Sequence, residues 1–484
     1  MRRRILALGL PVPAIAALLA ACASAPPDPQ AALKRAEAAM GSAQVRSLQF
    51  SGSGSGGIFG QAYRPGDPWP RITYSSFSRV YDYQNAAFRE EFARTRAEPN
   101  GGGALPLMGT GEQRATGLLR GTQAWNLAGT TATAAPLTAD GRIHDLWTSP
   151  HGVLRAAQRN NATTRVEGGK TLVSFTEPNR FRATAVIGES GLVERVDSVQ
   201  PNPVTGDTPT VTTYEDYRDF GGVKFPARIR QTQGGSPVLD LQVTQVQANT
   251  VPAIEVPAAV PGFVERATSE KVAEGVWFLA GGSHNSVLVE MADHLILIES
   301  PLYDARTQAV LTAAKQLVPN KPVRYVINSH HHFDHSGGLR TAAADGATLV
   351  TSELARPWFA QAFATPNAIA PDALARSGRP VRIEGVSGKR TFTDGTRTLE
   401  VMMIDGSVHA QGFMLAWLPR ERLLVEADAY TPGPAGAPPP AQPNANNVNM
   451  LDNVERLRLD VDRILPLHGR VVPIAELRAA AGRR

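Results

Sequence analysis

The 484-residue sequence is nearly without cysteine, since Cys22 is the only one. No intramolecular disulfide can form, so a disulfide-stabilised scaffold is excluded. The sequence also lacks a basic block beyond Arg2, Arg3 and Arg4, which supply three of the positive charges behind a formal net charge of +5. We therefore expect no nucleic-acid partner.

The chain also lacks the composition of a low-complexity or disordered protein. Its 44 glycines and 37 prolines together make up about 17% of the residues, which is below the roughly 25–30% that marks low-complexity chains. Hydrophobic residues make up 42% and charged residues 19%, which is enough apolar material for packed cores. At about 150 residues per domain, this length predicts two or three domains.

The first 21 residues predict an export signal. A basic start is followed by the apolar residues 5–21, which two prolines interrupt, and this disfavours a membrane-spanning helix. The run ends in a segment that resembles a bacterial lipobox at Cys22. The resemblance implies a lipid-anchored protein of the bacterial cell envelope, and Ala23 after the cysteine implies the outer membrane, facing the periplasm. Buried acyl chains contribute about 0.8 kcal/mol per methylene, so Cys22 would hold the chain at the membrane. Residues 22–30 would form a tether.

Residues 31–258 predict a mostly antiparallel β domain, because many alternating strand-like runs are separated by short turns. We expect a short helix at 30–40 and one continuous helix at 145–158. The segment 216–231 (DYRDFGGVKFPARIRQ) resembles lipoprotein-carrier (LolA/LolB-like) half-barrels. Residues 250–262 contain three prolines and predict a semi-rigid linker. The linker between the two domains is placed at 259–268.

Residues 269–484 predict an α/β domain, because strand-like and helical runs alternate. We expect strands at 275–280, 286–291, 294–299 and 323–328, with a helix at 307–318.

The strand expected at 323–328 runs directly into a cluster of metal-binding residue types, H-x-H-x-D-H. In an extended segment, residues two apart point the same way, so His330 and His332 can face one metal. Asp334 and His335 follow as the chain turns and can face a second position. Imidazole and carboxylate are usual ligands for zinc.

This motif resembles that of the metallo-β-lactamase-fold hydrolases, which implies an αββα sandwich over about residues 265–480. The family uses further ligands downstream, each at the end of a strand-like run. His409, Asp428 and His468 stand at such positions and in the expected order.

The resemblance implies two zinc ions about 3.5–4 Å apart that share a hydroxide, with iron or manganese as possible substitutes. Asp334 would also act catalytically by orienting the hydroxide. The implied ligands are His330, His332 and His409 for one metal, Asp334, His335 and His468 for the other, and Asp428 as the bridge.

Several functions stay open at this point. The leading hypothesis is an exported hydrolase of an ester, lactone, thioester or amide bond in a small molecule. A class B-like β-lactamase is a second hypothesis, although the subclasses with a cysteine ligand are excluded and Asp428 is more typical of lactonases, thioesterases and phosphodiesterases. A third is a mononuclear iron enzyme of the persulfide-dioxygenase type, and a fourth is a lipid- or ligand-binding lipoprotein acting through the N-terminal domain. Substrate, metal in the cell and oligomeric state do not follow from the sequence.

Weaker signals surround the motif. His284 and Tyr430 are candidate substrate contacts, and His331 is expected to point away from the metal. Glu299 stands where the family often has aspartate, outside the ligand set. Residues 431–450 are either a mobile lid or an inert loop.

Overall fold

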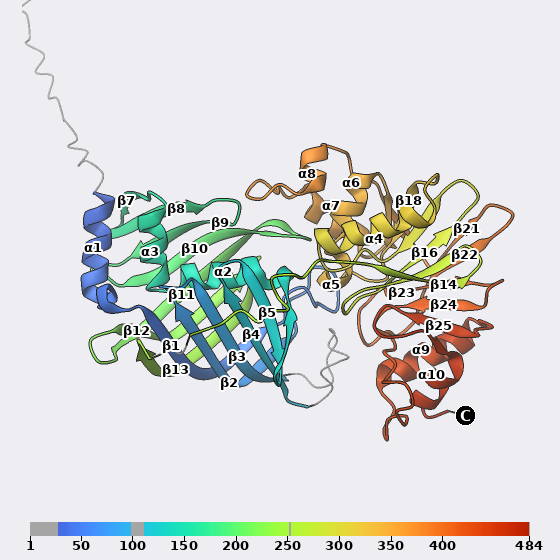
Figure 1. The fold of residues 1–484 in the computed structure, drawn as a ribbon, viewed down its shortest axis with the longest axis horizontal. Helices are drawn as coiled ribbons and strands as arrows, with labels where there is room; N and C mark the ends of the chain where they lie inside the picture. The colour runs from blue at the N-terminus through green and yellow to red at the C-terminus, as the bar shows by residue number, and fades with distance from the viewer. Residues whose placement is uncertain (1–27, 98–110, 251–252, 484) are drawn as a thin grey trace, which may run out of the picture.

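The computed structural model describes residues 28–97, 111–250 and 253–483, which form two parts side by side (Figure 1). The predicted signal peptide and Cys22 lie outside the described residues, as does most of the predicted tether. Among the residues described, no helix is both long enough and apolar enough to cross a membrane.

The N-terminal part is one antiparallel sheet, thirteen-stranded over the described residues, in the order β6-β5-β4-β3-β2-β1-β13-β12-β11-β10-β9-β8-β7. The first and last strands in sequence, β1 and β13, pair in its middle, with Leu48 opposite Ala248. The strands are β1 (Ser47–Gly57), β2 (Arg71–Asp82), β3 (Ala87–Arg96), β4 (Gln113–Arg120), β5 (Gln123–Ala128), β6 (Thr131–Ala134), β7 (Thr163–Glu167), β8 (Lys170–Glu177), β9 (Phe181–Ile187), β10 (Val193–Asn202), β11 (Gly206–Asp219), β12 (Lys224–Gln233) and β13 (Ser236–Ala248).

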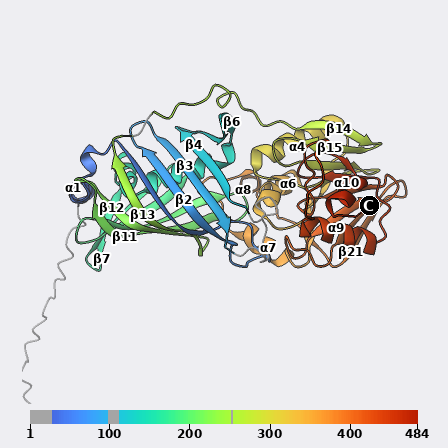
Figure 2. The same ribbon diagram turned by 90° about the horizontal axis from the view of Figure 1, so that it is seen from below.

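Alternating side chains bury one face of this curved sheet under helices (Figure 2). In β1, Leu48 and Phe50 are both almost fully buried. They pack with Leu33 and Met40 of a helix whose first turn is capped by Asp28. The helical segments are α1 (Pro29–Met40), η1 (Ser42–Gln44), η2 (Pro136–Thr138), α2 (Ala139–Thr148) and α3 (Gly152–Arg159).

One expectation for this part needs correction. The continuous helix expected at 145–158 is wrong, because α2 ends at Thr148 and α3 begins only at Gly152. Pro150 between them has no N–H to donate, and the Ser149 hydroxyl accepts from the Gly152 N–H at 3.2 Å. Within the stretch 250–262, which is predicted to be a semi-rigid linker, Ile254 and Val260 are buried in a cluster with Val80, Leu118 and Trp125. The boundary at 259–268 and the likeness to lipoprotein carriers stay predictions.

The C-terminal part stacks two sheets with helices on both outer faces (Figures 1 and 2). Strands β17, β18, β19 and β20 pair in parallel within the first sheet, and β24 and β25 pair in parallel within the second. The first sheet contains β14 (Thr268–Ala273), β15 (Val276–Ala280), β16 (Ser286–Glu290), β17 (Leu295–Ile298), β18 (Val323–Ile327), β19 (Thr348–Ser352) and β20 (Ile383–Val386). The second contains β21 (Lys389–Thr393), β22 (Thr398–Met403), β23 (Met414–Leu418), β24 (Leu423–Glu426), β25 (Arg463–Pro466) and β26 (Val472–Pro473).

The main core lies between these two sheets, where Ile296 and Ile327 of the first meet Val401 and Val425 of the second. A second core lies between the first sheet and its helices, around Phe359. The helices are α4 (Asp304–Leu317), α5 (Phe333–Ser336), α6 (Leu339–Asp345), α7 (Arg356–Ala364), α8 (Ala373–Ser377), α9 (Ala445–Arg456) and α10 (Ile474–Ala480). The predicted fold class, an αββα sandwich preceded by a mostly antiparallel β domain, is confirmed.

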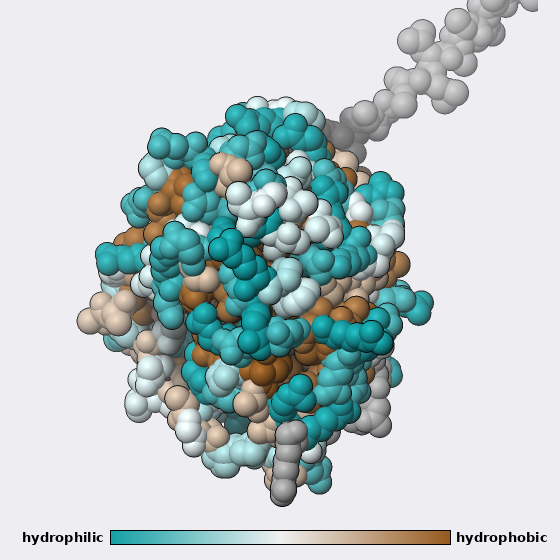
Figure 3. Space-filling view, turned by 90° about the vertical axis from the view of Figure 1, so that its right-hand side faces the viewer, coloured by the Kyte–Doolittle hydropathy of each residue, from teal (hydrophilic) through white to brown (hydrophobic). Residues whose placement is uncertain are grey.

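The surface of the molecule exposes few hydrophobic side chains, as expected when most of them are buried in the cores. The face drawn in Figure 3 is mostly hydrophilic, with separate hydrophobic patches. Large hydrophobic side chains that stay exposed are few among the described residues, namely Leu137, Val166, Phe263, Val264, Leu354 and Val408.

Candidate metal centre

The H-x-H-x-D-H segment follows the carboxyl end of β18, an interior strand of the first sheet. His330 lies in a bend after the strand, and His332 has extended backbone angles just before the short helix α5, which contains Asp334 and His335. The chain direction therefore changes between the first two side chains and the next two.

The second sheet brings the later residues to the same place. His409 follows β22, while Asp428 follows β24 and His468 follows β25. Because β24 and β25 are parallel, their carboxyl ends meet at one edge of the sheet. The structure therefore gathers all seven predicted ligands at one edge of the sandwich.

Four side chains form a first group: His330, His332, His409 and Asp428. The Nε2 atom of His330 lies 2.9 Å from Nδ1 of His332 and 3.1 Å from Nε2 of His409. An Asp428 oxygen lies 2.8 Å from Nε2 of His409. Three nitrogens and one carboxylate oxygen therefore converge on a single point.

A second group beside it contains Asp334, His335, His468 and His284. The Nε2 atoms of His335 and His468 are 3.2 Å apart. The Oδ2 atom of Asp334 lies 3.2 Å from Nε2 of His284 and 3.8 Å from Nε2 of His335.

Asp428 joins the two groups through its two oxygens. Its Oδ1 lies 2.7 Å from Nε2 of His468, and its Oδ2 lies 3.2 Å from Nε2 of His335 as well as close to His409. This is the position that the sequence analysis assigned to a bridging carboxylate.

Three of the ring nitrogens that face away from the centre are held by acceptors, whereas the buried Nδ1 of His409 has no hydrogen-bond partner. Nδ1–H of His335 donates to Glu299 at 3.0 Å, and Nδ1–H of His468 donates to the Ser283 carbonyl at 2.9 Å. Nε2–H of His332 donates to the Ala62 carbonyl at 2.9 Å. Each bond fixes the tautomer that leaves the lone pair of the other nitrogen pointing inward, as metal-ligating histidines require.

Glu299 takes part in this arrangement through both of its carboxylate oxygens. The oxygen that does not accept from His335 accepts the Ser329 N–H at 2.6 Å, beside the start of the ligand segment. The residue is fully buried and adopts φ +69°, a left-handed conformation that costs energy for a side chain other than glycine. Its longer side chain still reaches His335, so the departure from aspartate leaves this contact intact.

Charge also favours cations here. Burial, aided by His335 for the first and His330 for the second, holds the pKa of His330 and His332 well below 6.5, so both are neutral ligands at neutral pH. Burial opposes ionisation of Asp334 and Asp428, but His335 outweighs it and holds the pKa of both carboxyls well below the ordinary value. Burial lowers the pKa of His335, but the carboxylates of Asp428, Asp334 and Glu299 outweigh burial and raise that pKa well above 6.5. His335 therefore supplies one positive charge, and the rest of the negative charge on the two buried carboxylates calls for a bound cation. The donor set therefore fits divalent metal ions of the zinc type.

Access to the centre is one-sided. The side chain of Asp334 is 30% exposed, against 10% for His468 and 6% for Asp428. The first group is closed, since His330 and His332 have almost no exposed surface. The centre is therefore open to solvent on the side of Asp334.

Sequence reasoning placed His284 among substrate contacts, but the structure groups it with the second set of ligands. Its carbonyl accepts from the buried Arg306 at 3.1 Å, and its Nδ1 lies 2.8 Å from the Ser283 hydroxyl. The sequence feature that singled out His284 was a histidine at the turn before β16. Nothing in the local sequence shows that this turn lies against His468.

The remaining weak candidates lie apart from the two groups. His331 contacts the Ala62 carbonyl through Nε2 at 2.8 Å. Tyr430 is buried in the core between the sheets, and its N–H donates to Glu426 at 3.0 Å. Residues 433–445 are exposed, and α9 begins at their end.

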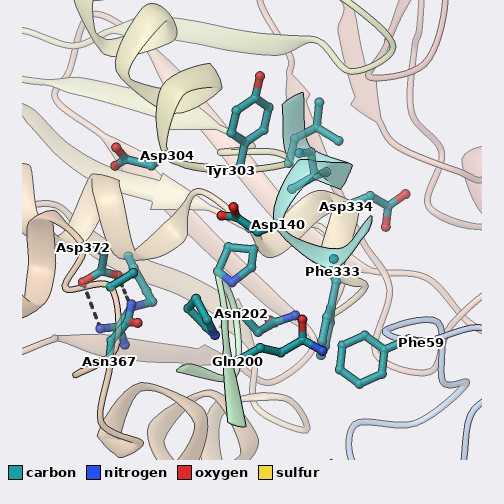
Figure 4. A pocket seen from close by; sticks show the side chains of 18 of the residues that line it. Phe59, Asp140, Gln200, Asn202, Tyr303, Asp304, Phe333, Asp334, Asn367 and Asp372 are labelled. Atoms are coloured by element: carbon teal, nitrogen blue, oxygen red, sulfur yellow. Dashed lines mark hydrogen bonds and ion pairs between the residues drawn. The ribbon is translucent and has the colours of Figure 1, made fainter. Parts of the chain in front are cut away.

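A cavity of about 540 Å³ lies between the two parts of the molecule and borders Asp334 (Figure 4). Leu137 and Asn202 line it from the N-terminal part, and Tyr303 and Asp372 line it from the C-terminal part. The Asp334 carboxylate points away from the centre of this cavity in Figure 4.

The family model described as the metallo-beta-lactamase superfamily matches residues 279–468. The C-terminal half of the chain therefore contains a metallo-beta-lactamase superfamily domain. The match includes His284 and all seven predicted ligands.

Known proteins resemble the same half. The curated 2,4-dinitroanisole O-demethylase subunit alpha of Nocardioides sp. (strain JS1661) is 24% identical over 183 residues, which are 37% of this chain. The chain spans about half of that relative, 52% of its length. Solved metallo-beta-lactamases from Pontibacter korlensis and Hirschia baltica are 19% and 18% identical, and both have a TM-score of 0.35. Each similarity covers 45% of this chain, with 98% and 97% of the respective structures.

The role of Glu299 is testable through metal affinity. Glutamine has one acceptor oxygen, so in Glu299→Gln its amide NH₂ must face either Ser329 N–H or His335 Nδ1–H. We expect zinc affinity, measured by competition with a chromogenic chelator, to fall about 10- to 100-fold. Glu270→Gln, at an exposed position on β14, is the control. Wild-type affinity in Glu299→Gln would show that Glu299 does not orient the ligands.

Proposed function

We propose that this chain is an exported, metal-dependent hydrolase that uses a dinuclear zinc site to cleave an ester, lactone, thioester or amide bond in a small molecule. The observation that carries the proposal is the convergence of seven side chains on two adjacent positions, with Asp428 shared between them. The hydrogen bonds that hold the outward ring nitrogens support a metal centre rather than a chance cluster of histidines.

Two bound divalent cations would supply Lewis acidity and lower the pKa of a water molecule toward neutrality. The chain's own residues then define how substrate reaches that water. Asp334 directs Oδ2 toward the second group and has the most exposed side chain of the seven, so it is placed to orient the attacking water. The closed first group, around His330 and His332, excludes bulk water from the opposite side.

A shared aspartate at Asp428 favours a lactone, ester or thioester over a β-lactam, by resemblance to the family members that carry one.

The test is turnover by the purified full-length chain loaded with zinc. The panel contains a lactone, a thioester, a p-nitrophenyl ester, nitrocefin as the β-lactam, and 2,4-dinitroanisole, which the name of the curated relative suggests. We expect turnover of at least one oxygen or sulfur ester at about 1–1,000 per second. A chelator should abolish it, and His332→Ala should lower it at least about 100-fold, since even the loss of an outer-shell partner costs 10- to 100-fold.

His294→Ala is the matched control, because His294 lies outside both groups. Elemental analysis should give about two zinc ions per chain. Turnover that survives complete metal removal would contradict the proposal. Turnover of nitrocefin alone would favour a β-lactamase, and one tightly held iron per chain would favour a dioxygenase.

We also propose that the chain reaches the cell envelope through lipidation of Cys22. In the bacterial host, Cys22→Ser should shift the protein from the membrane fraction to the soluble fraction, because the anchoring acyl chains are lost. Mass spectrometry of the mature N-terminus is the direct readout. An unmodified cysteine in the wild-type protein would contradict lipidation.

A further inference from the structure

A loop of the N-terminal part reaches the metal centre. Residues 58–70 connect β1 to β2 and extend to the C-terminal part in both ribbon views (Figures 1 and 2). This segment, the 58–70 loop, lies about 270 positions from the ligand motif in sequence and yet contacts two of the predicted ligands directly, namely His332 and Asp334.

The first contact is through the Ala62 backbone. Its carbonyl oxygen accepts from Nε2–H of His332 at 2.9 Å and from Nε2–H of His331 at 2.8 Å. A carbonyl oxygen can only accept, so His332 carries its proton on Nε2 and keeps the Nδ1 lone pair free. That Nδ1 is the atom that faces His330 in the first group.

The second contact is through the Gln61 side chain. Its Nε2 donates to Oδ1 of Asp334 at 2.8 Å. The other oxygen of Asp334 is the one that faces His284 and His335 in the second group. Gln61 therefore holds one carboxylate oxygen and aims the other at the proposed metal.

The loop is fixed firmly enough to do this. The Phe333 N–H donates to the Gly60 carbonyl at 3.1 Å, and the ring centroids of Phe59 and Phe333 are 5.1 Å apart (Figure 4). Three residues after Gly60, the Tyr63 hydroxyl donates to the Ser407 carbonyl at 2.9 Å, close to His409 in sequence. The loop thus spans the two ligand-bearing segments 329–336 and 405–411.

We propose that the 58–70 loop is a positioning element of the metal centre, so that the N-terminal domain is required for full metal affinity. Gln61 positions Asp334 at the second metal, and the Ala62 carbonyl positions His332 at the first. The inference rests on the proposed metal centre but not on any particular substrate.

The first variant is Gln61→Leu, which keeps the size of the side chain and removes the donor. Metal affinities of the full-length chain are measured stepwise by chelator competition. The position that contains Asp334 should lose about 10- to 100-fold in affinity, while the position that contains His332 stays unchanged. Arg64→Gln, at an exposed position of the same loop, should change neither. A loss confined to one position is not what general destabilisation would produce.

The second variant, Gly60→Ala, displaces the loop as a whole. Gly60 has φ +82°, and a Cβ there would lie 2.4 Å from Cγ of Phe333, so the loop must move away from α5. Gly235→Ala is the matched control, because Gly235 has φ +83° and a Cβ there meets nothing within 4 Å. Both substitutions carry the same backbone strain, but only Gly60→Ala should weaken both metal positions.

Cobalt substitution gives a readout that is independent of turnover. The visible absorption of the cobalt-loaded protein reports ligand geometry, so it should change in Gln61→Leu and in Gly60→Ala and stay as in wild type in both controls. Wild-type affinities and spectra in both test variants would overturn the inference and leave the proposed hydrolase intact. Altered metal binding in a chain that hydrolyses nothing would support the inference and contradict the proposed function.

Discussion

The structure of the C-terminal domain depends on placing two ionised carboxylates, Asp334 and Asp428, in a nearly closed space lined by imidazoles. Each carboxylate alone would carry a large desolvation cost. His335 offsets that cost in part, because burial lowers its pKa but Asp428, Asp334 and Glu299 outweigh burial and raise that pKa well above 6.5. The remaining deficit of positive charge is what a pair of divalent cations would supply. The two sheets serve this site by bringing strand ends from both of them to one edge.

The same constraint underlies the role proposed for the 58–70 loop of the N-terminal part. A metal-ligating histidine needs its outward nitrogen held, and an aspartate ligand needs its second oxygen held. The C-terminal part supplies such partners for His335 and His468 from Glu299 and Ser283. For His332 and Asp334 the partners come from the 58–70 loop. The N-terminal part therefore contacts the metal-binding side chains themselves and not only the surface around them.

The sequence predicted the ligands that lie close together in the chain. Four of the ligands lie within six residues and repeat a spacing that extended backbone followed by a turn requires, so His330 to His335 are identifiable from pattern alone. His409, Asp428 and His468 need the family resemblance, because no local pattern relates residues on three separate strand ends. The helix predicted across Pro150 is wrong because the helical spacing of apolar residues continues across this proline, and proline breaks a helix at an interior position.

The contacts of the 58–70 loop are not predictable from the sequence at all. Gln61 and Ala62 carry no motif, and their partners lie in another domain. Every residue has a backbone carbonyl, so the residue type does not indicate which hydrogen bond that carbonyl accepts. Only the folded structure shows it. His284 illustrates an intermediate case, since its residue type indicates a role in the site but its neighbours in the fold do not follow from the sequence.

The most direct test of the central claim is anomalous X-ray diffraction from crystals of the zinc-loaded full-length chain, recorded on both sides of the zinc absorption edge. A dinuclear centre should give two anomalous peaks about 3.5–4 Å apart. One peak should lie among His330, His332 and His409, the other among Asp334, His335 and His468, with Asp428 between them. A single peak, or peaks away from these residues, would contradict a dinuclear centre at this edge of the sandwich.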